Sequence, residues 1–294
     1  MITGSLVAIV TPMQPNGQID WDALERLIEF HIAQGTRGIV AVGTTGESPT
    51  VTPEEHIQCI QFVTNKVNGR IPVIAGTGAN STAEAIHLAK GAQAAGCDAH
   101  LSVSPYYNKP NQRGLFAHFS AIAAACDLPL ILYNVPGRTC SDIAPETVKK
   151  LAEIPHIIGI KEASTIERCR ELLRICPADF AIYSGDDPIN CQIIHEGAAG
   201  AISVTANVAP KLMASVCELA KTDFAAAKAI DDCLQPLHKQ LFIEPSPAPT
   251  KWALAQMGYI KNTLRLPLVP LDEAHYGCVE AALSAAHIAL PKTV

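Results

Sequence analysis

The stretch Ile157-Ile158-Gly159-Ile160-Lys161-Glu162-Ala163-Ser164 places a lysine at the end of an apolar run. Such a run predicts a strand buried on both faces, as in a parallel sheet covered by helices. A lysine there would lose hydration, which favours the neutral amine, and a neutral amine is a nucleophile towards carbonyl carbons. For a lone lysine the commoner interpretation is an ammonium that reaches solvent or pairs with Glu162, because buried lysines are rare.

Similar short apolar runs recur along the chain, separated by amphipathic segments. This alternation predicts parallel strands joined by helical crossovers. Eight such units match a closed (β/α)8 TIM barrel better than an open sheet, and no Gly-x-Gly-x-x-Gly fingerprint follows the first run to indicate a dinucleotide-binding fold. The predicted strands are Ser5–Thr11, Gly38–Gly43, Pro72–Thr77, Ala99–Ser104, Leu130–Asn134, Ile157–Lys161, Phe180–Ser184 and Gly200–Val204.

Helix start signals support this register. Thr52-Pro53-Glu54-Glu55 is a capping box with proline at the first helical position, and Ser81 precedes Glu84 in similar style. After Pro210 only helical patterns remain, broken at Pro236, at 245–247 and at 267–270, so we expect a catalytic barrel over residues 1–224 and a C-terminal helical extension over 225–294. The predicted barrel helices are Trp21–Gln34, Pro53–Val67, Ser81–Ala95, Gly114–Cys126, Pro145–Glu153, Ile166–Cys176, Pro188–Glu196 and Lys211–Lys221.

The composition narrows the class of protein. Hydrophobic residues make up 48% of the 294 residues and charged residues 17%, which is enough apolar material for a large core. The net charge is −6 without a basic block, which disfavours nucleic acid and anionic membranes as partners. With no leader pattern and no apolar run of membrane-spanning length, we expect a cytoplasmic protein. The ten cysteines lack C-x-x-C spacing and are expected to be reduced thiols, not metal ligands.

Polar residues gather where the predicted strands end, which is where barrel enzymes place their chemistry. Each group alone has an ordinary structural interpretation: a tight turn, aromatic packing at a rim, a surface ion pair. Asp186 and Asp187 are expected to cap a helix ahead of Pro188, in preference to binding a metal. The groups are Gly43-Thr44-Thr45-Gly46-Glu47-Ser48, Ser104-Pro105-Tyr106-Tyr107-Asn108-Lys109-Pro110, Tyr133-Asn134-Val135-Pro136-Gly137-Arg138-Thr139, Lys161-Glu162, Ser184-Gly185-Asp186-Asp187 and Val204-Thr205-Ala206-Asn207.

Together these groups would surround one barrel mouth with an amine, phenols, hydroxyls and a guanidinium. The amine of Lys161 can attack a keto group, a tyrosine can relay protons, and Arg138 can hold a carboxylate through two hydrogen bonds. The iminium that forms is itself the electron sink, so no metal or organic cofactor is needed. The set predicts a lyase of the class I aldolase type.

These blocks resemble the 4-hydroxy-tetrahydrodipicolinate synthase family of the pyruvate-dependent lyase superfamily, over essentially the whole chain. The resemblance implies condensation of pyruvate with L-aspartate 4-semialdehyde, the first committed step of diaminopimelate and lysine biosynthesis. It implies that Lys161 forms the Schiff base with pyruvate and that Tyr133 relays protons. It further implies that Thr44 links Tyr133 to Tyr107, which in this family reaches into the site of a neighbouring subunit.

The resemblance also implies how the substrates are held. Thr45 would bind the pyruvate carboxylate, and Arg138 the carboxylate of the semialdehyde. Gly185 and Ile202 match positions whose backbone lines the pyruvate pocket. The family is typically a homotetramer built as a dimer of dimers, so the same assembly is expected here.

Several members of the family are inhibited by L-lysine. Glu84 would pair with the ammonium group of the inhibitor, and Asn80 and Tyr106 would bind its carboxylate. Pro49 and Pro53 depart from residues common in sensitive members, although the capping box explains Pro53 without any regulation. The matching positions are Ser48, His56, Asn80, Glu84 and Tyr106.

Two alternatives stay open. A sister aldolase, such as N-acetylneuraminate lyase or a 2-keto-3-deoxy-sugar-acid aldolase, would use the same lysine and tyrosine but would need a pocket for a polyhydroxylated chain. Arg138 favours a short acidic aldehyde instead. A barrel without catalytic activity, serving as a sensor or assembly protein, is disfavoured because Lys161, Tyr133 and Arg138 are all present.

Overall fold

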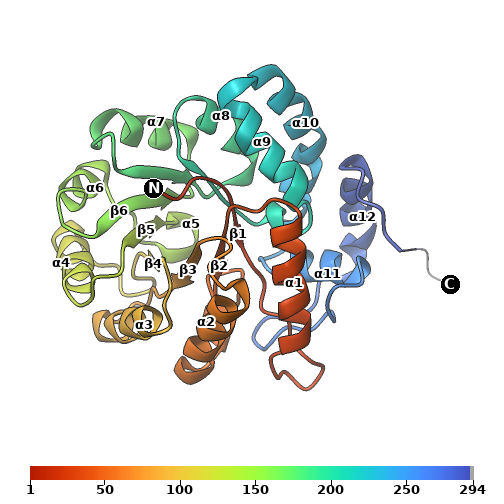
Figure 1. The fold of residues 1–294 in the computed structure, drawn as a ribbon, viewed down its shortest axis with the longest axis horizontal. Coiled ribbons are helices and arrows are strands. Elements are labelled where there is room, and N and C mark those ends of the chain that lie inside the picture. Colours follow the sequence, from red (N-terminus) through yellow and green to blue (C-terminus); the bar gives the residue numbers. More distant parts are fainter. Residues whose placement is uncertain (292–294) are drawn as a thin grey trace.

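The computed structural model describes residues 1–291, and its parallel strands close into a barrel surrounded by helices (Figure 1). The ring closes where β1 pairs with β8, with Leu6 opposite Ile202. All eight predicted strands are confirmed, most of them one or two residues shorter than expected. The strands are β1 (Gly4–Ala8), β2 (Gly38–Ala41), β3 (Val73–Gly76), β4 (Ala99–Val103), β5 (Leu130–Asn134), β6 (Ile157–Glu162), β7 (Ala181–Ser184) and β8 (Gly200–Ser203).

Helices follow the strands in the order expected of a TIM barrel. None of those in residues 1–291 combines the length and the apolar content that a bilayer crossing requires. The α-helices are α1 (Trp21–Ala33), α2 (Pro53–Val67), α3 (Thr82–Ala94), α4 (Gln112–Ala123), α5 (Pro136–Thr139), α6 (Pro145–Leu151), α7 (Ile166–Ile175), α8 (Asn190–His195), α9 (Pro210–Thr222), α10 (Phe224–Gln240), α11 (Ala248–Gln256) and α12 (Tyr276–Ala285). Short 3-10 turns are η1 (Ser48–Thr50), η2 (Asp187–Ile189), η3 (Thr205–Asn207) and η4 (Glu273–His275).

The strands are buried on both faces, as the apolar runs predicted. Successive side chains of a strand point to opposite faces, so each strand contributes to two separate cores. Leu6, Val40 and Ile131 belong to the small core inside the barrel. Val7 and Ile39, their neighbours in sequence, belong to the larger core between the strands and the helices.

The helix start signals of the sequence are confirmed where side chains cap them. Thr52 accepts a hydrogen bond from the backbone N–H of Glu55, whose carboxylate accepts one from Thr52 N–H, and α2 begins at Pro53 as predicted. Helix α4 begins at Gln112, two residues earlier than expected, because Asn111 is its N-cap and accepts from Gly114 N–H.

Two expectations about local structure are wrong. Helix α10 continues through Pro236, although proline removes one backbone hydrogen bond, because the helix is held along its length against α9, α8 and α12. Asp186 and Asp187 make no capping hydrogen bond to η2. Asp187 instead accepts from the backbone N–H groups of Val204 and Thr205, and so ties the end of β7 to the end of β8.

The C-terminal helices pack on the barrel of their own chain. Helix α10 lies along α9, and α11 contacts η3 at the end of β8 (Figure 1). Lys251 of α11 and Arg265 of the following segment form ion pairs with Glu47 and Glu55, next to the end of β2. The division of the chain at residue 224 stays a prediction, and residues 292–294 of the predicted extension lie outside the described part.

Candidate active site

Lys161 lies inside the barrel next to a tyrosine. It is 5% exposed, and its Nζ lies 4.4 Å from the centroid of the Tyr133 ring. Tyr133 and Lys161 are register partners on β5 and β6 and therefore point to the same face. Glu162 faces away from the barrel interior and accepts hydrogen bonds from Asn134 and Ser164. Pairing of Lys161 with Glu162, the commoner interpretation of a lone lysine, is therefore wrong.

Gly185 provides the space that the lysine side chain occupies. A Cβ at this position would lie 2.6 Å from Lys161 Cε and 2.8 Å from Ala163 Cβ, closer than a Cβ approaches another carbon atom in proteins. The backbone N–H of Gly185 donates to Glu162 O, which continues the pairing of β6 and β7 past the strand end. Ile202 on β8 belongs to the same interior core and is fully buried.

The turn after β2 carries Thr44 and Thr45 at the mouth of the barrel. Thr45 is buried, whereas Thr44 is partly exposed and lines a cavity. Val42, just before the turn, has φ of +54°, which is a strained conformation for a β-branched residue. Within residues 1–291 no hydrogen bond joins the Thr44 hydroxyl to Tyr133 or Tyr107.

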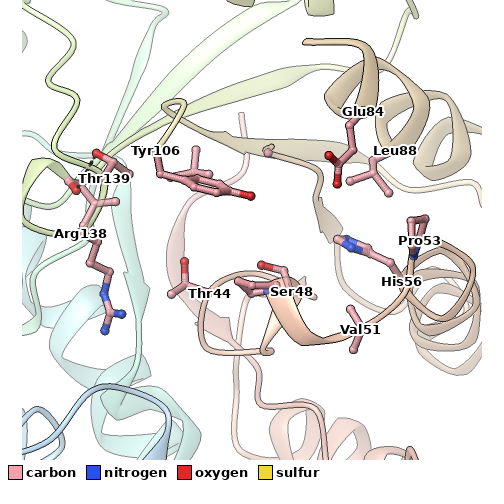
Figure 2. Close-up of a pocket in the computed structure, with 14 residues that line it drawn as sticks. Thr44, Ser48, Val51, Pro53, His56, Glu84, Leu88, Tyr106, Arg138 and Thr139 are labelled. Atoms are coloured by element: carbon pink, nitrogen blue, oxygen red, sulfur yellow. Dashed lines mark hydrogen bonds between the residues drawn. The ribbon is translucent and has the colours of Figure 1, made fainter. Parts of the chain in front are cut away.

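A cavity of about 330 Å³ opens at this mouth, and we call it the mouth cavity (Figure 2). In Figure 2, Arg138 lies on one side of Thr44 and of the Tyr106 ring, and Glu84 and His56 lie on the other. Lys161 does not line the mouth cavity. The cavity is lined by Thr44, Ser48, Pro49, Val51, Pro53, His56, Gly78, Glu84, Leu88, Val103, Tyr106, Val135, Arg138 and Thr139.

Four of the five positions matched to the lysine site of the family line the mouth cavity. They are Ser48, His56, Glu84 and Tyr106, and the fifth, Asn80, uses its side-chain amide to donate to Tyr106 O. Burial and the negative charge of Glu84 raise the pKa of the Tyr106 phenol. Burial lowers the pKa of His56, whose Nε2 lies 2.6 Å from Gly76 O.

Tyr107 lies outside the site formed by its own chain. Its side chain is 88% exposed, and its φ of +75° is in the left-handed region. The structure thus brings Lys161 and Tyr133 together and places Thr44 and Arg138 at the mouth cavity. It leaves Tyr107 on the surface.

One group of residues next to the site was not identified from the sequence. Asn134, the last residue of β5, is fully buried and donates to Asp142 and Glu162. Arg168 pairs with Asp142 at 2.9 Å. Burial raises the pKa of Glu162. This network ties the end of β5 to the end of β6, one residue after Tyr133 and Lys161 respectively. The carboxylate directly after Lys161 in an apolar strand was the available signal for it.

Comparison with known proteins gives consistent matches along nearly the whole chain. A protein of Nitrosospira multiformis named 4-hydroxy-tetrahydrodipicolinate synthase is 56% identical over 295 residues, which covers 100% of this chain and 98% of that protein. The crystal structure of a dihydrodipicolinate synthase from Acinetobacter baumannii, complexed with pyruvate, superimposes with a TM-score of 0.97 at 52% identity, covering 98% of this chain and 100% of that one.

A third relative was solved with a different ligand. The enzyme from Cyanidioschyzon merolae, with lysine bound, has a TM-score of 0.95 and 36% identity, covering 98% of this chain and 99% of that one. The model of the dihydrodipicolinate synthetase family matches residues 1–286. The chain therefore belongs to the dihydrodipicolinate synthetase family.

Proposed function

We propose that this protein condenses pyruvate with L-aspartate 4-semialdehyde to give 4-hydroxy-tetrahydrodipicolinate. The observation that carries the proposal is the buried lysine: Lys161 has no carboxylate partner among residues 1–291 and faces the ring of Tyr133. A buried amine without an ion-pair partner is suited to nucleophilic attack on a keto carbon. The names of the relatives, at up to 56% identity, support the choice of substrates.

The reaction follows from these groups. Lys161 Nζ attacks C2 of pyruvate, and loss of water leaves an iminium ion. Removal of a methyl proton gives an enamine, whose carbon attacks the aldehyde of the second substrate. The amino group of that substrate then attacks C2 of the imine, which closes the ring and releases the lysine. Tyr133 is the proton relay, Thr45 holds the pyruvate carboxylate, and Arg138 fixes the acceptor through its carboxylate.

Reductive trapping tests the Schiff base directly. Incubation with pyruvate and borohydride is expected to add the reduced three-carbon unit to the peptide that contains Lys161. The peptide that contains Lys251, which is also buried, is an internal control and should stay unmodified. An unchanged Lys161 peptide, or a label on another lysine, would contradict the proposal.

The choice of acceptor needs a separate measurement. We expect turnover of pyruvate with aspartate semialdehyde and none of N-acetylneuraminate or 2-keto-3-deoxy-sugar acids. Arg138 is exposed at the mouth and can reach a second carboxylate. Faster cleavage of a sugar acid than condensation with the semialdehyde would assign the chain to a sister aldolase.

We further propose that L-lysine binds in the mouth cavity and inhibits. Glu84 and Tyr106 line this cavity together with Thr44, so the ammonium group of a bound lysine would lie close to the turn that carries Thr44 and Thr45. The lysine found in the Cyanidioschyzon merolae relative supports the proposal. Initial rates measured with millimolar lysine are expected to fall, and to fall less in Glu84→Gln. Rates that do not change in the wild type would remove this part of the proposal.

Assembly is a related proposal. Within residues 1–291 the side chain of Tyr107 is left exposed, and its φ of +75° is strained, which supports a dimer in which it reaches the partner's site. The homotetramer and the cytoplasmic location stay predictions. Sedimentation measurements on the wild type and Tyr107→Ala are expected to show a weaker dimer for the variant, together with a lower kcat.

A further inference from the structure

The turn that carries Thr44 and Thr45 contains a residue held in an unfavourable backbone conformation. Glu47 has φ of +59°, a region that a residue with a Cβ seldom adopts unless its surroundings hold it there. The turn is closed by backbone bonds of its own, from Gly46 N–H and Ser48 N–H to Gly43 O and from Glu47 N–H to Thr44 O. Both the N–H and the hydroxyl of Thr50 donate to Glu47 O. These local bonds leave the Glu47 carboxylate unbound, so its side chain needs partners from elsewhere in the chain to hold the turn against the rest of the molecule.

The side chain of Glu47 is bound by the C-terminal extension. Lys251 Nζ on α11 donates to Glu47 Oε1 at 2.5 Å, and the backbone N–H of Arg265 donates to Oε2 at 3.2 Å. The side chains of Glu47 and Lys251 are both fully buried. A buried carboxylate and a buried ammonium are each unfavourable alone, so each requires the other in this position.

Arg265 adds a second anchor at the far end of the same turn. Its Nη1 donates to Thr50 O at 2.9 Å, and its guanidinium binds both carboxylate oxygens of Glu55 at 2.6 and 2.7 Å. Its Nε donates to Gly17 O in the loop after β1. The extension thus holds the turn at Glu47, directly before η1, and at Thr50, the last residue of η1.

We propose that Lys251 and Arg265 are positioning residues, which hold Glu47 so that Thr44 and Thr45 face the pyruvate position. This inference rests on the proposed function, because it assigns the two threonines their roles in that reaction. A buried ion pair is often no more stabilising than an apolar pair of the same volume. The directional contacts of the pair do, however, fix where the Glu47 carboxylate lies. They thereby also fix the backbone of Glu47, which is three residues after Thr44.

A set of variants separates positioning from stability. Lys251→Met and Glu47→Gln each leave a buried group without its partner, whereas the double variant leaves no unpaired charge. We expect both single variants to melt at a lower temperature and the double variant to recover much of that loss. Kinetic constants are to be expressed per active site that borohydride traps with pyruvate, so that unfolded protein does not count.

Per trapped site, we expect the double variant to lose about 100-fold in kcat/KM for pyruvate, the size of effect that a displacement of about 1 Å produces. The KM for the semialdehyde should stay within about twofold, because Arg138 lies on α5 and not on the turn. Lys261→Met is the matched control. Lys261 belongs to the same segment but donates to Gln14, away from the turn, and its replacement should leave all constants unchanged.

The outcomes discriminate clearly. If the double variant regains both stability and wild-type constants per site, the ion pair is only structural and the inference is overturned. Arg265→Gln keeps Glu47 and Lys251 paired and is expected to show a smaller defect of the same kind, so the inference stays testable if Lys251→Met does not fold. If the wild type itself traps no pyruvate, the proposed function fails. If the wild type traps pyruvate normally and the variants keep wild-type constants, only the positioning role fails.

Discussion

At the scale of single residues, Lys161 lies between two tyrosines with different environments. Tyr133 on β5 and Tyr183 on β7 are both its register partners. The Tyr183 hydroxyl donates to Ile2 O at 2.7 Å, and burial raises the pKa of this phenol to about 12. The Tyr133 hydroxyl forms no such bond within residues 1–291, which supports its proposed role as the proton relay.

The two tyrosines provide a matched pair of variants. We expect Tyr133→Phe to lower kcat by about 10²- to 10⁴-fold, the usual contribution of a positioned acid or base. Tyr183→Phe loses one internal hydrogen bond and should lower the free energy of unfolding by about 1 kcal/mol while kcat stays unchanged. Steady-state kinetics and chemical denaturation of both proteins check this. Equal losses of kcat in Tyr133→Phe and Tyr183→Phe would show that the phenol of Tyr133 is not the specific proton relay.

At the scale of elements, the strands and most helices could be predicted because each carries local signals. The first residue of α2 follows from its capping box and from Pro53 at its first position. The short helix α5 was missed, because Pro136-Gly137-Arg138-Thr139 is too short to show a period. The continuation of α10 through Pro236 was also missed, because it depends on helices that pack against it.

Pro236 gives a prediction for this scale. A proline inside a helix costs about 3 kcal/mol relative to alanine, partly offset by the smaller entropy of the unfolded chain. Pro236→Ala should therefore raise the free energy of unfolding by about 2 kcal/mol. Pro145, at the first position of α6, has no such cost, and Pro145→Ala should give no gain. Denaturant titration of both variants measures the difference, and a destabilised Pro236→Ala would contradict it.

At the scale of the whole molecule, three buried histidines link stability to pH. Burial lowers the pKa of His31 to about 3 and the pKa of His100 and His118 to about 4. In each ring Nδ1 lies beside a threonine hydroxyl, and Nε2 has no partner within residues 1–291. A second proton on any of these rings would place an unpaired charge in the interior.

The sign of the pH effect follows directly. A histidine whose pKa is lower in the folded than in the unfolded state stabilises the fold at any pH above the unfolded pKa of about 6.5. This stabilisation is lost as the pH falls from the unfolded pKa to the folded pKa. We expect the melting temperature to fall between pH 6.5 and 4. His100→Gln should weaken this dependence, whereas replacement of the exposed His87 should not. A pH profile that is identical in the wild type and His100→Gln would contradict the assignment.

The fold class could be predicted because it depends on the period of the apolar runs, and so could the place of three candidate residues at strand ends, although their roles stay proposals. Lys161 ends its predicted strand, Tyr133 is the next-to-last residue of Leu130–Asn134, and Arg138 follows that strand. The buried pair of Glu47 and Lys251 could not, because its members are 204 residues apart and each alone resembles a surface charge. The network of Asn134 and Glu162 was missed for a similar reason, since the two residues meet only through the pairing of β5 with β6.

The pairing of β1 with β8 has a consequence for how the protein is made. Translation delivers β1 first, but β8, the second strand that pairs with β1, emerges only with Gly200–Ser203. Lys251, the ion-pair partner of Glu47, emerges later still. Until then the nascent barrel has an open edge that other chains can join. We expect ribosome-stalled chains that end before residue 200 to be digested readily by protease, and chains that extend past the C-terminal segment to resist. We therefore expect activity to be acquired only when synthesis is almost complete. A prematurely ended chain is expected to be unfolded and to bind chaperones, and not to have partial activity.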